Sequence, residues 1–251
     1  MPFPYNLQRP DDTYTLGTKL DEISGINPMR GNSLACVEDE LRDIYELKNG
    51  KISNHFSSGK KGDSEDIVVI NNKAYILDAA ECTIYEYKDF KKSMKKPIKH
   101  DLKLKKDFDP EGMCHDKHTN CLLIACKGNP KKDSTVRKVF MFDLKQQKRK
   151  NKAYFSIDSK TLLGKASRKT FNPSGIAIHP RTREIYLIGT SSLKMVVRLN
   201  KSGDKVLNKK NIKKNIYGQP EGITFSGQGD LFISSEAKDG KKGKIFKFKE
   251  A

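Results

Sequence analysis

The amino-acid sequence predicts an all-β fold, and two observations lead to this prediction. The 251-residue chain contains five copies of one strand pattern, and each copy opens on a Ser-Gly, Glu-Gly or Glu-Asp dipeptide, at residues 24, 65, 111, 174 and 221. Within each copy, continuous apolar segments are followed by alternating segments and then by lysine-rich ones. This order is expected for successive strands that run from a buried centre to a solvent-exposed edge. Such repeats are typical of propeller blades, so the sequence predicts a five-bladed β-propeller with four-stranded antiparallel blades.

The four strands of a blade can be assigned in order. The first begins at the dipeptide and ends at a polar turn such as "HPRTRE". The second is a continuous apolar run such as "CLLIA", which indicates burial on both faces. The third alternates, as in "TIYEY", which indicates a half-exposed strand. Lysine-rich segments that begin at Lys88, Lys145, Asn208 and Lys238 are expected on outer strands and connecting loops.

Two segments decide how the ring is counted and closed. The interval between the third and fourth dipeptides leaves room for a sixth blade, but its "SIDSKTLLGKASRKTF" lacks the strand pattern, so we expect an outer strand followed by a short helix or loop. The "TYTL" that begins at Thr13 is expected to be the outer strand of the last blade, which closes the ring and removes a sheet edge. Residues 1–12 are then expected to form an N-terminal tether, and residues 13–251 a single propeller domain.

The net charge is +18, from 49 basic and 31 acidic residues, and most of the basic residues are lysine. Specific readers of nucleic acid favour arginine, whose planar fork contacts bases and phosphates bidentately. We therefore expect a solvated lysine belt and no specific nucleic-acid partner. The alternative is attraction to a polyanion or an anionic lipid surface. No apolar run is long enough to predict a membrane-spanning helix.

Five cysteines with irregular spacing argue against a disulfide framework. Cys36 and Cys126 fall on apolar strands and are expected to be small buried hydrophobic residues. Cys114 and Cys121 enclose two histidines in "CHDKHTNC", a composition that zinc sites share. This segment is a turn of the repeat, however, and its spacing is not that of a zinc knuckle, so coincidence is favoured. His179 is expected to be a turn residue. We find no catalytic motif and assign no catalytic residue.

The first residues of the dipeptides should converge on the propeller axis, because the innermost strands begin there. Three of them, Glu65, Glu111 and Glu221, are carboxylates, which repel one another unless a cation, a proton or a lysine joins them. Oxygen-rich clusters suit calcium. Further acids after the second strands are expected near the same face: Glu38, Asp39, Glu81 and Glu236. The alternative, which spacing leaves open, is that these side chains only bond to the amides of the neighbouring blade.

The segments "DPEGMCHDKHTNCLLIACKG", "NPSGIAIHPRTREIYLIGTSS" and "QPEGITFSGQGDLFISSE" resemble the SdiA-regulated family, distant relatives of the NHL-repeat propellers. The resemblance extends from about "LDEISGI" to the C-terminus and implies a five-bladed propeller with a calcium site. We carry over Glu65, Glu111 and Glu221, and we add Glu81 and Glu236 as metal ligands. The chain departs from the pattern at Asp66, where glycine is expected, and at "ACKG" and "IGTS", where an acid is expected.

The resemblance also implies an exported protein held at the cell envelope, in the periplasm or on the outer membrane, by a lipid anchor that precedes the propeller. Our first expectation is a monomeric, non-enzymatic, calcium-binding platform for a protein or small-molecule ligand. The second is a calcium-dependent hydrolase of phosphoesters or lactones, in which the metal activates a water. The third is a polyanion binder.

Overall fold

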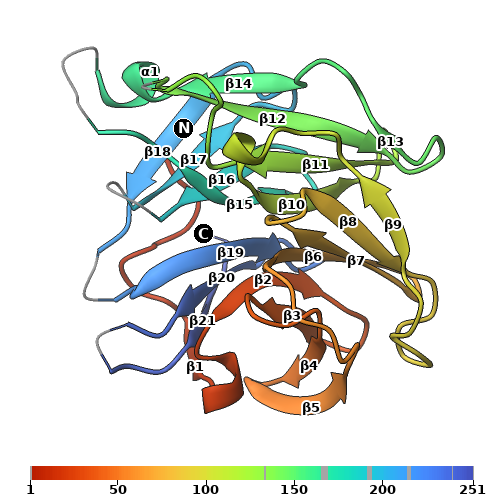
Figure 1. The fold of residues 1–251 in the computed structure, drawn as a ribbon. Helices are drawn as coiled ribbons and strands as arrows, with labels where there is room; N and C mark the ends of the chain where they lie inside the picture. Colours follow the sequence, from red (N-terminus) through yellow and green to blue (C-terminus); the bar gives the residue numbers. More distant parts are fainter. Residues whose placement is uncertain are drawn as a thin grey trace.

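The computed structural model describes residues 2–132, 134–164, 169–190, 194–213, 216–238 and 240–250. These residues form five antiparallel sheets that are arranged as blades around a common axis (Figure 1). In each blade the first three strands run outward from the axis in the order of the chain, and the elements are almost entirely strands. The all-β prediction and the five-blade count are therefore confirmed, and the six-blade alternative is wrong.

The strands of the five blades, from the axis outward, have the following bounds. Blade 1 contains β2 (Ile23–Pro28), β3 (Leu34–Glu38), β4 (Ile44–Lys48) and β5 (Lys51–Phe56). Blade 2 contains β6 (Ser64–Ile70), β7 (Lys73–Asp78), β8 (Thr83–Tyr87) and β9 (Ile98–Asp101). Blade 3 contains β10 (Pro110–Asp116), β11 (Cys121–Cys126), β12 (Val136–Asp143), β13 (Lys148–Arg149) and β14 (Phe155–Asp158). Blade 4 contains β15 (Pro173–Ile178), β16 (Ile185–Gly189), β17 (Met195–Leu199) and β18 (Val206–Asn211). Blade 5 contains β19 (Gln219–Phe225), β20 (Leu231–Glu236), β21 (Lys244–Phe248) and the N-terminal β1 (Asp12–Thr15).

The ring is closed by the N-terminal strand, as "TYTL" predicts. β1 pairs antiparallel with β21, with Thr13 opposite Phe246. The two ends of the chain therefore share one blade, so the edge of β21 is not left open. Because β1 takes the outermost place, the lysine-rich segment from Lys238 leads into the third strand of blade 5. The segments that begin at Lys88, Lys145 and Asn208 contain or overlap the outer strands of their blades.

Blade 3 explains the long interval between the third and fourth dipeptides. Its outer edge is divided, because β13 and β14 both pair with β12. β14 is followed by the helix α1 (Ser159–Leu163), whose N-cap Asp158 accepts a hydrogen bond from the backbone N–H of Lys160 at 3.0 Å. The expected outer strand and short helix are confirmed in the described part of this segment, and residues 165–168 lie outside it. Two short 3-10 helices, η1 (Thr18–Leu20) and η2 (Lys106–Phe108), complete the elements.

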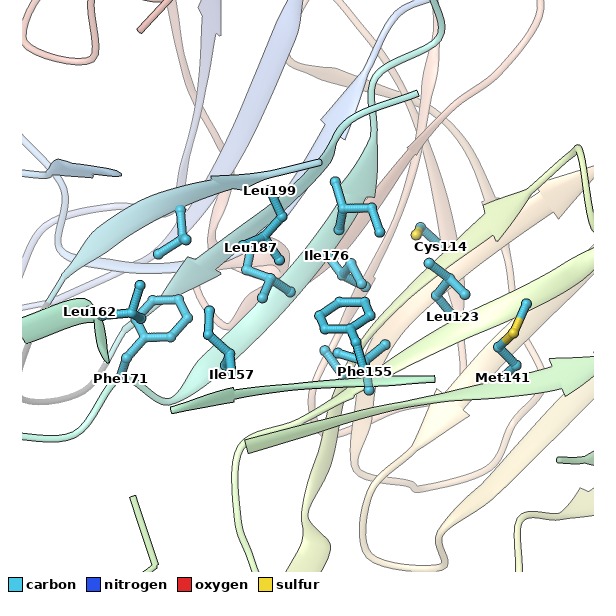
Figure 2. Packing of buried hydrophobic residues seen from close by; sticks show 14 of the residues in the cluster. Cys114, Leu123, Met141, Phe155, Ile157, Leu162, Phe171, Ile176, Leu187 and Leu199 are labelled. Atoms are coloured by element: carbon cyan, nitrogen blue, oxygen red, sulfur yellow. The ribbon is translucent and has the colours of Figure 1, made fainter. Parts of the chain in front are cut away.

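The core lies between adjacent blades. Figure 2 shows the cluster between blades 3 and 4, where Leu123 and Met141 face Ile176 and Leu187. Both faces of each sheet are covered in this way, which is why the second strands are continuous apolar runs. All five cysteines are free and buried, so the predictions of no disulfide framework and of buried Cys36 and Cys126 are confirmed. No helix in the described part of the chain is long and apolar enough to cross a membrane.

The residues before β1 contact the propeller. Tyr5 and Leu7 are buried in the core cluster of blades 4 and 5. The hydroxyl of Tyr5 donates to the carbonyl of Gly229 at 2.7 Å, and the hydroxyl of Tyr217 donates to the carbonyl of Leu7 at 3.0 Å. The described residues of segment 1–12 therefore do not form a free tether. Attachment to a membrane from this end of the chain stays a prediction.

Candidate metal centre

Every inner strand carries a β-bulge at its dipeptide. In blade 2, Ser64 pairs with Asp78 and Asp66 pairs with Leu77, so that Glu65 is the extra residue. The same shift leaves Glu111 without a cross-strand partner in blade 3, and shifts at the dipeptide occur in the other three blades as well. A bulge bends the strand and redirects the extra side chain. This local irregularity directs the first residue of the dipeptide away from the ordinary pleat of the sheet.

The glycines of the dipeptides permit close contact between blades. A Cβ atom on Gly175 would lie 2.6 Å from the carbonyl oxygen of Glu221, and one on Gly112 would lie 2.8 Å from the Cα of Gly175. Asp66, which takes the glycine position in blade 2, is buried and accepts a hydrogen bond from the backbone N–H of Met113 at 2.6 Å. Asp66 also accepts a hydrogen bond from the backbone N–H of Ile67 at 2.8 Å, so it bonds within its own strand as well as to the neighbouring blade.

The three dipeptide glutamates are held in a setting that favours their protonated form. Glu111 and Glu221 are buried, and Glu65 is half-buried. Burial raises the pKa of Glu65 to about 10, and repulsion from Glu111 adds to this effect. Burial likewise raises the pKa of Glu111 to about 8 and that of Glu221 to about 7. The sequence-predicted carboxylates thus act on one another, as expected for groups that converge on the axis.

Lys127 provides positive charge within this group. Its Nζ donates to Oε1 of Glu111 at 2.8 Å. Burial works against the ammonium, but Glu111 outweighs it, so the pKa of Lys127 is raised. The same charge partly offsets the rise that burial causes in the pKa values of Glu65, Glu221 and Glu236. Lys127 is the lysine of "ACKG", and the departure of this segment from the acidic pattern was the sequence signal that could have identified it.

Glu22, Asp39 and Glu236 form a second acidic group at the same end of the propeller. Each offers a carboxylate oxygen, and the three oxygens lie within 4.8 Å of one another. Burial raises the pKa of Glu236 to about 8, with further contributions from Glu221, Glu22 and Asp39. We call these three residues together with Glu65, Glu111 and Glu221 the axial acidic cluster.

The chemistry of the axial acidic cluster fits a calcium ion. Oδ1 of Asp39 and Oε2 of Glu221 are buried and have no hydrogen-bond partner among the described residues. A buried carboxylate oxygen without a partner is costly, and a cation would remove the cost. Two oxygens on one ion lie at most twice the ligand distance apart, which is roughly 5 Å for calcium and about 4.2 Å for magnesium. The three oxygens lie within 4.8 Å of one another, a separation that one calcium ion can span.

The structure distributes the other expected acids differently. Glu81 lies outside the cluster: it is exposed, forms an ion pair with Arg42 at 2.9 Å, and is hydrogen-bonded by Tyr85, which lowers its pKa. Glu38 is buried beside Asp39, and burial raises its pKa to about 7. Glu22, two residues before the dipeptide of blade 1, was missed by sequence reasoning.

The cysteine-histidine segment does not form a metal site in the described part of the chain. Cys114 and Cys121 belong to the apolar core between blades 3 and 4, and the candidate ligand group found among the described residues contains neither of them. His179 lies in a turn, where its Nδ1 accepts a hydrogen bond from the backbone N–H of Thr182 at 3.1 Å. The interpretation of His179 as a turn residue agrees with this geometry.

The fold and the cluster define a five-bladed β-propeller with an acidic axial end that could bind a metal. The sequence profile of the SdiA-regulated family matches residues 13–238, and the chain belongs to this family. No curated protein matches the sequence.

Several solved structures share the fold. A glucose dehydrogenase superposes with a TM-score of 0.60 at 10% identity, over 96% of this chain and 100% of that one. The PQQ-bound aldose sugar dehydrogenase of Streptomyces coelicolor gives 0.59 at 12% identity, over 96% and 97%. A gluconolactonase of Xanthomonas campestris gives 0.53 at 11% identity, over 100% and 89%. At such identities the likeness shows the propeller fold alone.

Proposed function

We propose that this protein is a calcium-binding β-propeller of the cell envelope, whose axial face serves as a binding platform. The observation that carries the proposal is the convergence of Glu22, Asp39 and Glu236 beside Glu221, where one buried carboxylate oxygen each of Asp39 and Glu221 has no partner among the described residues. Lys127 compensates only part of this negative charge. A divalent cation would compensate the remainder, with ligands of the type that calcium prefers.

Binding of a cation at this cluster would be linked to proton release. Burial raises the pKa of Glu221 to about 7 and that of Glu236 to about 8. An adjacent positive charge favours the ionised carboxylates and lowers both pKa values. Calcium affinity is therefore expected to rise as the pH increases from 6 to 8, where these protons leave most easily.

The platform role follows from the number of ligands that calcium takes. Calcium binds six to eight oxygens, whereas the converging group provides three carboxylates and the neighbouring Glu221 a fourth. Positions that remain can be taken by water or by oxygens of a partner molecule. Location at the envelope through a lipid anchor, and a monomeric state, rest on the family resemblance.

The test is thermal unfolding with calcium and with a chelator, combined with calorimetric titration of calcium. A ligand that binds only the folded state stabilises it by mass action, by about 2.7 kcal/mol at a concentration one hundred times Kd. We expect calcium to raise the melting temperature of the native protein, and Glu236→Gln to reduce this response. Glu81→Gln makes the same change of charge outside the cluster and should respond like the native protein. Indifference of the native protein to both calcium and chelator would refute the proposal.

A second candidate function, calcium-dependent hydrolysis, is favoured by one observation. The raised pKa of Glu65, about 10, keeps a protonated carboxyl within the axial acidic cluster at neutral pH, and such a group can act as a general acid. One protein of similar fold is a gluconolactonase. Turnover of lactones or phosphoesters that requires calcium, and that Glu65→Gln abolishes without loss of calcium binding, would establish this function in place of the platform role.

A further inference from the structure

The opposite end of the propeller contains a cavity of about 470 Å³. It is lined by residues from the C-terminal ends of β2, β6, β10, β15 and β19, so all five blades contribute to it. A strand rises about 3.3 Å per residue, and Lys117 follows Glu111 by six positions, so the cavity lies roughly 20 Å from the axial acidic cluster. Its volume is within the usual range of small-molecule sites.

The charged side chains of this cavity differ in sign from the axial acidic cluster. Arg183 and Lys117 line it, and neither forms a hydrogen bond or an ion pair through its side chain with the described residues. Asp116 is buried, and its two oxygens accept hydrogen bonds from the backbone N–H of His118 at 3.0 Å and from the hydroxyl of Thr119 at 2.7 Å. Asp116 is thus bonded within its own turn, and the side chains of Arg183 and Lys117 remain available to a ligand.

Arg183 occupies a backbone position that the other blades give to different residue types. A residue with positive φ precedes the second strand by one or two positions in every blade: Asn32, Asn71, Asn120, Arg183 and Gly229. Asparagine and glycine adopt this left-handed conformation readily, whereas arginine, with φ of 60°, does so against its preference. An unfavourable conformation at a cavity supports a binding role for the side chain.

Apolar and polar side chains share the remaining wall of the cavity, and the polar ones include His115, His118 and His179. Pro28, Val69, Ile178 and Phe225 line it from four different blades. A site with an apolar wall and a few converging polar groups is typical of small organic ligands. We propose that this cavity binds a small organic anion, with its carboxylate or phosphate on Arg183 and Lys117 and its apolar body against the wall.

The test is calorimetric titration of the full chain with benzoate, phenyl phosphate and inorganic phosphate. Chelator is present throughout, so that a cation at the axial acidic cluster cannot recruit the anion. We expect one organic anion to bind saturably at a single site, and the tighter of the two identifies the preferred anionic group. Arg183→Asn should weaken binding by about tenfold or more, because a charge-assisted hydrogen bond is lost.

The substitution has a built-in control for folding. Asn occupies the same position in three other blades, so Arg183→Asn should leave the melting temperature unchanged or raise it. Arg9→Asn removes the same charge from an exposed residue outside the cavity, and it should leave binding unchanged. The proposal is overturned if neither organic anion binds at millimolar concentration, if inorganic phosphate binds as tightly as both of them, or if the two variants weaken binding equally.

Discussion

Replacement of Glu221 by glutamine should change the stability of the protein with opposite signs in chelator and in calcium. Burial raises the pKa of Glu221 from its ordinary 4.5 to about 7 in the folded protein. The folded state therefore holds this proton more tightly than the unfolded state. The contribution of Glu221 to the free energy of unfolding is fully present below pH 4.5 and falls as the pH rises. Above pH 7 this contribution is lost, and the loss no longer changes with pH.

The size of the loss follows from the shift in pKa. A change of about 2.5 units at 1.36 kcal/mol per unit corresponds to about 3 kcal/mol of destabilisation at pH 8 without metal. Glutamine has the shape of the protonated side chain and cannot ionise, so Glu221→Gln should recover this amount in chelator at pH 8. For a chain of this size, the melting temperature should rise by roughly 6 to 12 °C. At pH 5, the variant and the native protein should differ little.

Calcium should reverse the comparison at pH 8. The native protein gains stability when the cation compensates Glu221, whereas the variant has lost one carboxylate from the site and gains less. The assay is calorimetric unfolding at pH 5 and pH 8, each with calcium and with chelator. The reasoning would be refuted if Glu221→Gln were less stable than the native protein in chelator at both pH values, because the carboxylate would then be a stabilising group in its own right.

Three further predictions concern the axial acidic cluster, the contacts between blades and the lysine-rich surface. Lys127→Met removes a cation that competes with the metal, and calcium affinity measured by calorimetry should rise by about tenfold or more; an unchanged affinity would place the ion away from Lys127. Gly175→Ala places a Cβ 2.6 Å from the carbonyl of Glu221, so denaturant unfolding should show a loss of about 1 to 3 kcal/mol, and a neutral result would mean that the blades can separate without cost. Duplex DNA titrated near physiological salt should bind weakly, whereas tight binding with a steep salt dependence would favour the polyanion binder.

The sequence by itself determined the fold and its closure. The five dipeptides, the continuous apolar second strands and the outer strand at Thr13 are local patterns that report how deeply each strand is buried. Burial on both faces requires a continuous apolar run wherever the strand lies, so the assignment did not depend on contacts between distant residues. For the same reason, the sequence placed Glu65, Glu111 and Glu221 at the start of inner strands.

Only the tertiary structure decided which charged residues meet. Lys127, which directly follows β11, forms an ion pair with Glu111 of the paired strand β10 in blade 3, and Glu236 of blade 5 joins Glu22 and Asp39 of blade 1. Glu81 was expected in the cluster because it follows a second strand, but it lies in a turn, where it is exposed and forms an ion pair with Arg42. The contacts of Glu236 with the blade 1 acids and of Glu81 with Arg42 join side chains from different blades, so their separation along the chain does not report their distance in space.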